Sequence, residues 1–484
     1  MAYQWKVCLP NKFVYTFISL AIGVFCLVAD QQGISMALPT ISEYFSSDLP
    51  TTQWVLVSYV LAISVALLPM GRVSDLIGHK RIYVLGFGIC SITTLVAGFS
   101  PSILALIIAC FIRGIGSGMT QSTSMALMIS LFGRERTGQA LGIYISIVGV
   151  GSAAGPLISG YLLSTYDWRI LFFLLSVLGL IATSTAAVLV PGDKSKRLNL
   201  SNFHFDWIGA LLFTVSLSSF LQAMTWSPDL GYLDWRMIVL FLTSIFSVIG
   251  FVFRELTTSE PMMDLRFFKR RLFSSGVASA FLFFTGISCN YLFIPFYLQI
   301  VLGYEPYQIG FFTASSAISM AVVGAISGRF SDRFNPNWFT GSGLLISCLG
   351  MLILATLDMD SSWVAVVIGL ILISFGLGTF YGANNKIILS AIPRNSHGVV
   401  SGFIHLVRNS ASVISMGVGV VVVTSFMSSM GFAPTLAGLS VETEIAVLEA
   451  FVKGMKFVFL SFSFILMLGF FISLLGGKYI EEFG

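Results

Sequence analysis

About fourteen long apolar runs divide the chain, and each is close to the ~20 residues that a membrane-spanning helix needs. Only 10% of the residues are charged and 56% are apolar, whereas soluble proteins carry about 25% charged residues. The runs are expected to be helices, because hydrocarbon offers no water to satisfy backbone polar groups. We therefore expect an all-α polytopic membrane protein with 14 transmembrane helices.

The expected helices follow the apolar runs and end where charged or turn-forming residues begin. They cover residues 14–38, 53–70, 82–99, 102–131, 138–164, 168–190, 208–226, 236–253, 273–298, 308–328, 338–356, 362–391, 398–427 and 453–476.

The lysines and arginines predict the orientation of these helices. Nineteen of the 26 lie in the terminal segments and in alternate loops, and only four lie in the opposite loops. Because positively charged loops stay in the cytoplasm, we expect both termini to be cytoplasmic and the protein to lie in the inner (plasma) membrane. The net charge of +4 then reflects topology, so no nucleic-acid partner is expected.

A short charged motif occurs twice. Gly-Arg-Val-Ser-Asp at 71–75 returns as Gly-Arg-Phe-Ser-Asp at 328–332. Other markers repeat at nearly the same spacing, namely Pro39 with Pro295, and Gly138 and Gly142 with Gly398 and Gly402. These repeats predict a six-helix unit used twice in parallel orientation, with the substrate site between the units near the middle of the bilayer.

The repeat also predicts the domain organisation. Residues 1–200 would form the N-terminal six-helix half, and residues 261–484 the C-terminal half. Residues 201–260 hold two helices without a counterpart in either half, so we expect an inserted helix pair there.

The repeated motif is expected to gate the end of the bundle at which it lies. Its aspartate can accept hydrogen bonds from the start of a helix, and Gly78 allows a tight chain reversal. Topology alone would need positive charge but not this residue order, which argues against a simple anchor. The expected gating residues are Gly71, Arg72, Asp75, Gly78, Lys80, Arg81, Gly328, Arg329 and Asp332. The first copy is fuller, so Asp75 is expected to matter most.

Asp30 is the only carboxylate well inside an expected helix, where a charge costs roughly 2.5–3.5 kcal/mol at the centre of a membrane span. Reversible protonation would make it a proton-coupling acid. Arg113, in the fourth expected helix, could pair with the ionised acid and be released when the acid is protonated. The alternative is a permanent structural pair between the two.

Small residues in the fifth expected helix form another pattern, carried by Gly151, Gly155, Pro156 and Gly160. They allow close approach of a neighbouring helix, and the proline bends its own helix. The residues alone leave packing and gating equally open.

Several polar residues are candidates for a substrate cavity, namely Gln31, Gln32, Asn290, Tyr291 and Arg408. Lys386 is expected to extend its amine to the membrane surface, and His405 to be a hydrogen-bonded packing residue. The sequence has no phosphate-binding loop, metal cluster or nucleophile–base pair. We therefore expect no cofactor and no enzymatic activity, with a proton gradient as the energy source.

These motifs together resemble the major facilitator superfamily, in particular its fourteen-helix drug:proton antiporter branch. Residues 71–81 resemble the superfamily's motif between helices 2 and 3, and 328–333 its weaker copy. Asp30 with Ala37-Leu38-Pro39 resembles the helix 1 signature, although Gln32 and Ser35 replace its usual Thr and Asn. Arg113 matches the branch's helix 4 arginine, and residues 151–160 its antiporter motif.

The resemblance implies the major facilitator fold and proton-coupled export of small amphiphilic compounds, with Asp30 and Arg113 handling the proton. The later helices lack the extra acids of dication exporters, so an obligate dication is not the expected main substrate. A proton-coupled importer, a carrier of one specific metabolite, and a non-transporting scaffold or sensor remain alternatives. Expected partners are a small-molecule substrate, protons and the lipid bilayer; an accessory periplasmic adaptor is left open.

Overall fold

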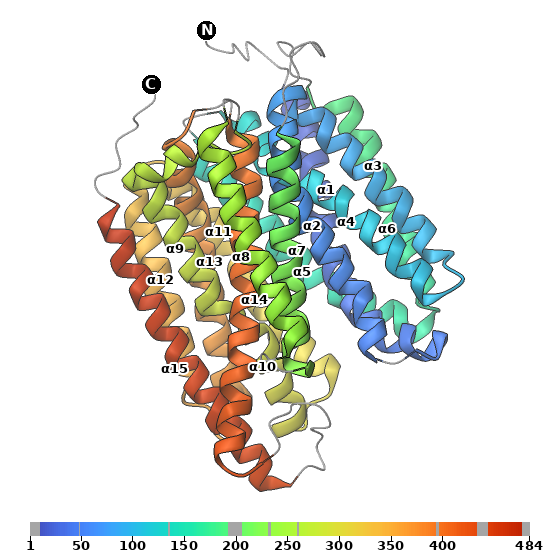
Figure 1. Ribbon diagram of the computed structural model, residues 1–484, viewed down its shortest axis with the longest axis vertical. Coiled ribbons are helices and arrows are strands. Elements are labelled where there is room, and N and C mark those ends of the chain that lie inside the picture. Colours follow the sequence, from blue (N-terminus) through green and yellow to red (C-terminus); the bar gives the residue numbers. More distant parts are fainter. Residues whose placement is uncertain are drawn as a thin grey trace.

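A computed structural model describes residues 10–47, 49–133, 136–191, 206–230, 234–258, 261–393, 396–432 and 444–476. Within these ranges the regular secondary structure is entirely helical. Long helices run side by side through the whole molecule (Figure 1). Thirteen of its helical segments are long and apolar enough to cross a membrane, and the described part of α7 adds a shorter apolar helix at Trp207–Ala223.

The helices of the first part of the chain and the inserted pair are α1 (Pro10–Phe45), α2 (Leu49–Ile77), α3 (His79–Gly98), α4 (Ile103–Phe132), α5 (Thr137–Thr165), α6 (Arg169–Leu189), α7 (Trp207–Leu230) and α8 (Trp235–Thr257). The later helices are η3 (Leu265–Lys269), α9 (Arg271–Ser288), α10 (Asn290–Phe296), η4 (Tyr297–Val301), α11 (Pro306–Ser331), α12 (Pro336–Leu354), α13 (Trp363–Ser390), α14 (His397–Ser429) and α15 (Ile445–Leu475).

The expected apolar segments are all helical, but several boundaries differ from the sequence prediction, and the expected helix at 273–298 is divided into α9, α10 and η4. α2 continues to Ile77 and α11 to Ser331, so most of each repeated motif is helical rather than a loop. Hydropathy fails here because a helix can continue past the apolar core when its last turn packs against protein. The last helix begins at Ile445, eight residues before its predicted start.

The bundle has two halves, α1–α6 and α9–α15, which lie next to each other (Figure 1). They meet along two seams. In the first seam α2 packs against α14, and in the second α5 packs against α11. The inserted α7 contacts both helices of the first seam and pairs with α8. The domain boundaries at residues 200 and 260 stay predictions, since both fall in or beside ranges outside the described residues.

Both seams are closed at the end of the bundle where α1 begins and α15 ends. We call this end the basic end, because its connections and the terminal segments hold the 19 lysines and arginines. A Cβ added to Gly142 would lie 2.3 Å from the Gly324 carbonyl oxygen, and one added to Gly402 would lie 2.3 Å from that of Leu67. Only glycine permits such backbone contact between helices.

Candidate functional site

Asp30 and Arg113 meet in the middle of the first half. Asp30 lies near the centre of α1, and its Oδ1 is 3.4 Å from Nη1 of Arg113 on α4. Arg113 is fully buried and Asp30 is 5% exposed. The Tyr59 hydroxyl, on α2, donates a long hydrogen bond of 3.5 Å to Oδ2 of Asp30. Three helices thus bring an acid, a cation and a phenol together away from solvent.

The contacts of this ion pair are loose. Arg113 lies over the Tyr59 ring, with Cζ 4.2 Å from the ring centre, which gives its charge a cation–π partner. Among the described residues, none of its three guanidinium nitrogens has a hydrogen-bond partner, nor has Oδ1 of Asp30. A buried pair that is not fixed by hydrogen bonds can separate at lower cost than a well-bonded one.

The backbone beneath Arg113 is held firmly. A Cβ added to Gly114 would lie 2.5 Å from the Tyr59 carbonyl oxygen on α2, and one added to Gly116 would lie 2.6 Å from that of Gly86 on α3. Because α4 touches both neighbouring backbones, the pair can separate more readily through side-chain rotation, or through movement of α1, than through a shift of α4.

The first repeated aspartate joins the two halves. Both carboxylate oxygens of Asp75, at the end of α2, accept backbone hydrogen bonds from Gly398 and Val399, each 2.8 Å long. These amides lie in the first turn of α14, where unpaired N–H groups and the helix dipole favour a negative charge. His79 Nε2 is 3.6 Å from the same carboxylate. We call this contact the Asp75 clasp.

The second repeated aspartate makes the reciprocal contact. Asp332, just after α11, accepts hydrogen bonds from the amides of Gly138 at 2.7 Å and Gln139 at 2.8 Å, in the first turn of α5. Lys386 Nζ of α13 is 2.8 Å from its Oδ1. We call this contact the Asp332 clasp. Lys386 is 7% exposed, so the prediction that it extends to the membrane surface is wrong: its amine is drawn inward by the carboxylate.

The motif glycines make room for the clasps. A Cβ on Gly71 would lie 2.7 Å from the Gly398 carbonyl oxygen, and one on Gly328 would lie 2.5 Å from that of Gly138. Gly78 has a φ of 108° and forms the whole link between α2 and α3, as its predicted role in a tight reversal requires.

The basic residues of the motif lie outside the carboxylate contacts. Arg81 and Arg329 are exposed, and Arg72 and Lys80 are half-buried. Arg81 donates to the carbonyl of Ile77, one turn earlier. These side chains suit a position at the membrane surface more than a direct part in joining the halves.

The small residues of α5 pack this helix against α1. A Cβ on Gly151 would lie 3.1 Å from Cβ of Val28, while one on Gly160 would meet no described atom within 4 Å. Gly155 is buried, and Pro156 lies inside α5 without ending the helix. The contact between Gly151 and Val28 therefore supports the packing alternative. It lies within one turn of Asp30.

The structure does not gather the predicted cavity residues into one group. Gln31 is half-buried, and the Gln32 side chain lies outside the described residues. Asn290, the first residue of α10, is buried and donates to the Ile287 carbonyl near the end of α9, so its side chain links these two helices. Tyr291 is 57% exposed, and Arg408 is half-buried.

Sequence reasoning missed Tyr59 and Ser117, which complete the surroundings of the ion pair. Their hydroxyls are 3.0 Å apart, and Ser117 lies one turn after Arg113. That spacing on α4 was the available signal for Ser117. A tyrosine within an apolar run gave none for Tyr59, because its position depends on how α2 packs.

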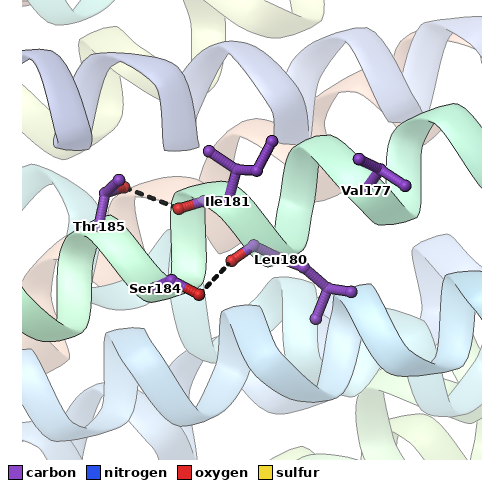
Figure 2. A pocket seen from close by; sticks show the side chains of 5 residues that line it. All are labelled: Val177, Leu180, Ile181, Ser184 and Thr185. Carbon is purple, nitrogen blue, oxygen red and sulfur yellow. Dashed lines mark hydrogen bonds between the residues drawn. The ribbon is translucent and has the colours of Figure 1, made fainter.

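An open hollow on α6 is not a second functional site. Its lining consists of Val177, Leu180, Ile181, Ser184 and Thr185, all from one helix (Figure 2). The two hydroxyls donate to carbonyls one turn earlier, at 2.8 and 2.9 Å. Such a surface, apolar and with its hydroxyls paired, suits contact with lipid.

Sequence comparison places this fold and these motifs in one family. The Major Facilitator Superfamily profile matches residues 20–416, and the chain belongs to that superfamily. It is 27% identical over 418 residues to the tetracenomycin C resistance and export protein of Streptomyces glaucescens, covering 86% of this chain and 76% of the relative. It is 28% identical over 433 residues to the riboflavin transporter RibZ of Clostridioides difficile, covering 88% and 90%.

A solved structure agrees with this assignment at the level of the fold. The proton:xylose symporter XylE bound to 6-bromo-6-deoxy-D-glucose superposes with a TM-score of 0.65 at 12% identity, covering 95% of each chain. The chain is thus a multi-pass membrane transporter of the major facilitator fold, with two inserted helices between its halves.

Proposed function

We propose that this protein is a proton-coupled antiporter of the fourteen-helix drug:proton branch, exporting small amphiphilic compounds by alternating access. The observation that carries the proposal is the buried Asp30–Arg113 pair, with its 3.4 Å separation and its missing hydrogen bonds. Ionisable groups inside a membrane are costly and usually mark ion or proton pathways. No cofactor is needed, because the proton gradient supplies the energy.

The clasps support an alternating-access cycle. They join the halves at the basic end, which the positive-inside rule assigns to the cytoplasm, so this conformation is closed inward. In the proposed cycle Asp30 takes up a proton from the outside, and its neutral form no longer holds Arg113. The change in this pair favours the conformation that opens at the basic end, where the proton leaves and the substrate enters.

The named relatives support export and also favour a second candidate. One relative is named as a resistance and export protein, which agrees with multidrug efflux. The other is named as a riboflavin transporter, which favours a carrier for one specific metabolite. The direction of substrate movement under a proton gradient separates an antiporter from a symporter.

Proteoliposomes test the proposal with riboflavin and rhodamine 6G as fluorescent probes. With an acidic lumen, an antiporter accumulates at least one probe as protons leave, whereas a symporter does not. Asp30→Asn should reduce this accumulation to the level of protein-free liposomes. The matched control is Asp360→Asn, an exposed carboxylate in the loop after α12, which should transport normally. Undiminished gradient-driven transport by Asp30→Asn would refute the assignment.

A further inference from the structure

A second group of buried polar side chains lies deeper in the bundle than the clasps. His405 follows Gly398 of the Asp75 clasp by two turns of α14, and Tyr144 follows Gly138 of the Asp332 clasp by nearly two turns of α5. Their ring centres are 6.3 Å apart. Tyr144 also stacks on Tyr381 of α13, with centres 6.3 Å apart and planes 8° apart. The group therefore spans the interface between the halves.

His405 is not the hydrogen-bonded packing residue that the sequence suggested. It is 1% exposed, and neither Nδ1 nor Nε2 has a hydrogen-bond partner in the part of the chain that the structure describes. The Tyr381 hydroxyl, from the same half, is buried beside Asn385. Buried polar atoms are nearly always paired, and exceptions call for an explanation such as a binding role. A neutral histidine offers one donor and one acceptor, which a ligand with the complementary groups could use.

The charge around this group is positive. Arg408 is half-buried and lies one turn beyond His405 on α14. Among the described residues, no carboxylate forms an ion pair with Arg408. Asp30, the acid near the centre of α1, is engaged with Arg113. An organic cation would therefore find no free negative partner here, whereas an anion would find a guanidinium.

We infer that His405, Arg408, Tyr144 and Tyr381 form a loading site for aromatic compounds that carry an anionic group. The guanidinium of Arg408 and the donor nitrogen of His405 would bind the anionic oxygens, and the tyrosine rings would stack on the aromatic frame. Tyr144 belongs to one half, and the other three side chains belong to the second half. Opening the clasps would separate them and expose the site at the basic end. The entry of the ligand from the basic end rests on the proposed export function, whereas the ligand class does not.

Two probes with the same aromatic frame test the ligand class. Purified full-length protein in detergent is titrated with 1-pyrenesulfonate, an anion, and with 1-pyrenemethylammonium, a cation, and binding is followed by pyrene fluorescence. We expect the anion to bind at least about tenfold more tightly. Arg408→Gln should weaken anion binding about tenfold and leave cation binding unchanged or stronger. Arg408→Lys should restore part of the affinity.

Controls keep the test independent of folding and of proton coupling. Arg236→Gln, an exposed arginine at the start of α8, should bind both probes as the unmodified protein does. His405→Leu should weaken anion binding while raising the melting temperature, because it removes two unpaired buried atoms. Equal binding of the two probes, preference for the cation, or equal loss of both in Arg408→Gln would overturn the inference. No gradient is present, so failure of proton coupling would not affect this result.

Discussion

The two halves share their clasps but not their buried charges. At the repeat offset of 256–260 residues, Asp30 corresponds to Gly286 or its neighbours, and Arg113 falls within the apolar residues 369–373. In the other direction, His405 and Arg408 correspond to Ile145 and Val148 of α5. The contact between the halves occurs twice, whereas the buried Asp30–Arg113 pair and the His405–Arg408 group each occur in one half. In the proposed cycle, gating is therefore shared by the two halves, and the chemistry is divided between them.

The largest expected effect, a loss of stability, comes from replacing the buried charges of the first half with apolar residues like those at the corresponding positions of the second half. Arg113→Leu leaves Asp30 buried without its cation and should destabilise the protein by about 3–5 kcal/mol. Adding Asp30→Leu to this variant should recover most of that stability, yet transport should stay absent. Thermal unfolding in detergent measures the first effect, and the proteoliposome assay measures the second.

Arg236→Leu serves as the control, because that arginine is exposed. If the double variant still drives probe transport with a proton gradient, the division of chemistry between the halves is wrong. If Arg113→Leu alone is as stable as the unmodified protein, the pair does not form as described.

A smaller effect is expected at the clasps, where the halves are alike. Each aspartate accepts two charge-assisted hydrogen bonds, and such bonds contribute about 1.5–3 kcal/mol each. Asp75→Asn or Asp332→Asn should therefore shift the equilibrium toward opening at the basic end by about tenfold or more. Asp332→Asn should shift it further, because it also removes an ionic partner of the buried Lys386. Distances between spin labels on the ends of α2 and α14, and of α11 and α5, report the opening.

The matched control is Asp264→Asn, an aspartate at the start of η3 that lies outside both seams. Unchanged spin-label distances in both clasp variants would contradict the role given to the repeated motif. A larger effect for Asp75→Asn than for Asp332→Asn would restore the order expected from the fuller first copy of the motif.

The sequence was sufficient to predict the helical segments and to single out the aspartates and glycines that form the clasps. Apolar length alone locates spans such as α4 and α13, because each must cross the same thickness of hydrocarbon. It could not show that Asp75 reaches amides 323 residues away, since such a contact depends on how the halves dock. The motif's helical end, the burial of Lys386 and the unpaired His405 were missed for the same reason: each depends on a neighbour from another helix.

The central claim is that Asp30 releases its proton when the substrate binds. It is tested most directly by isothermal titration calorimetry of the purified protein with whichever pyrene probe binds more tightly, in two buffers with different enthalpies of ionisation. By linkage, a proton displaced by the ligand makes the observed heat depend on the buffer. We predict buffer-dependent heat for the unmodified protein and buffer-independent heat, with binding retained, for Asp30→Asn. Equal buffer dependence in both proteins would contradict the account.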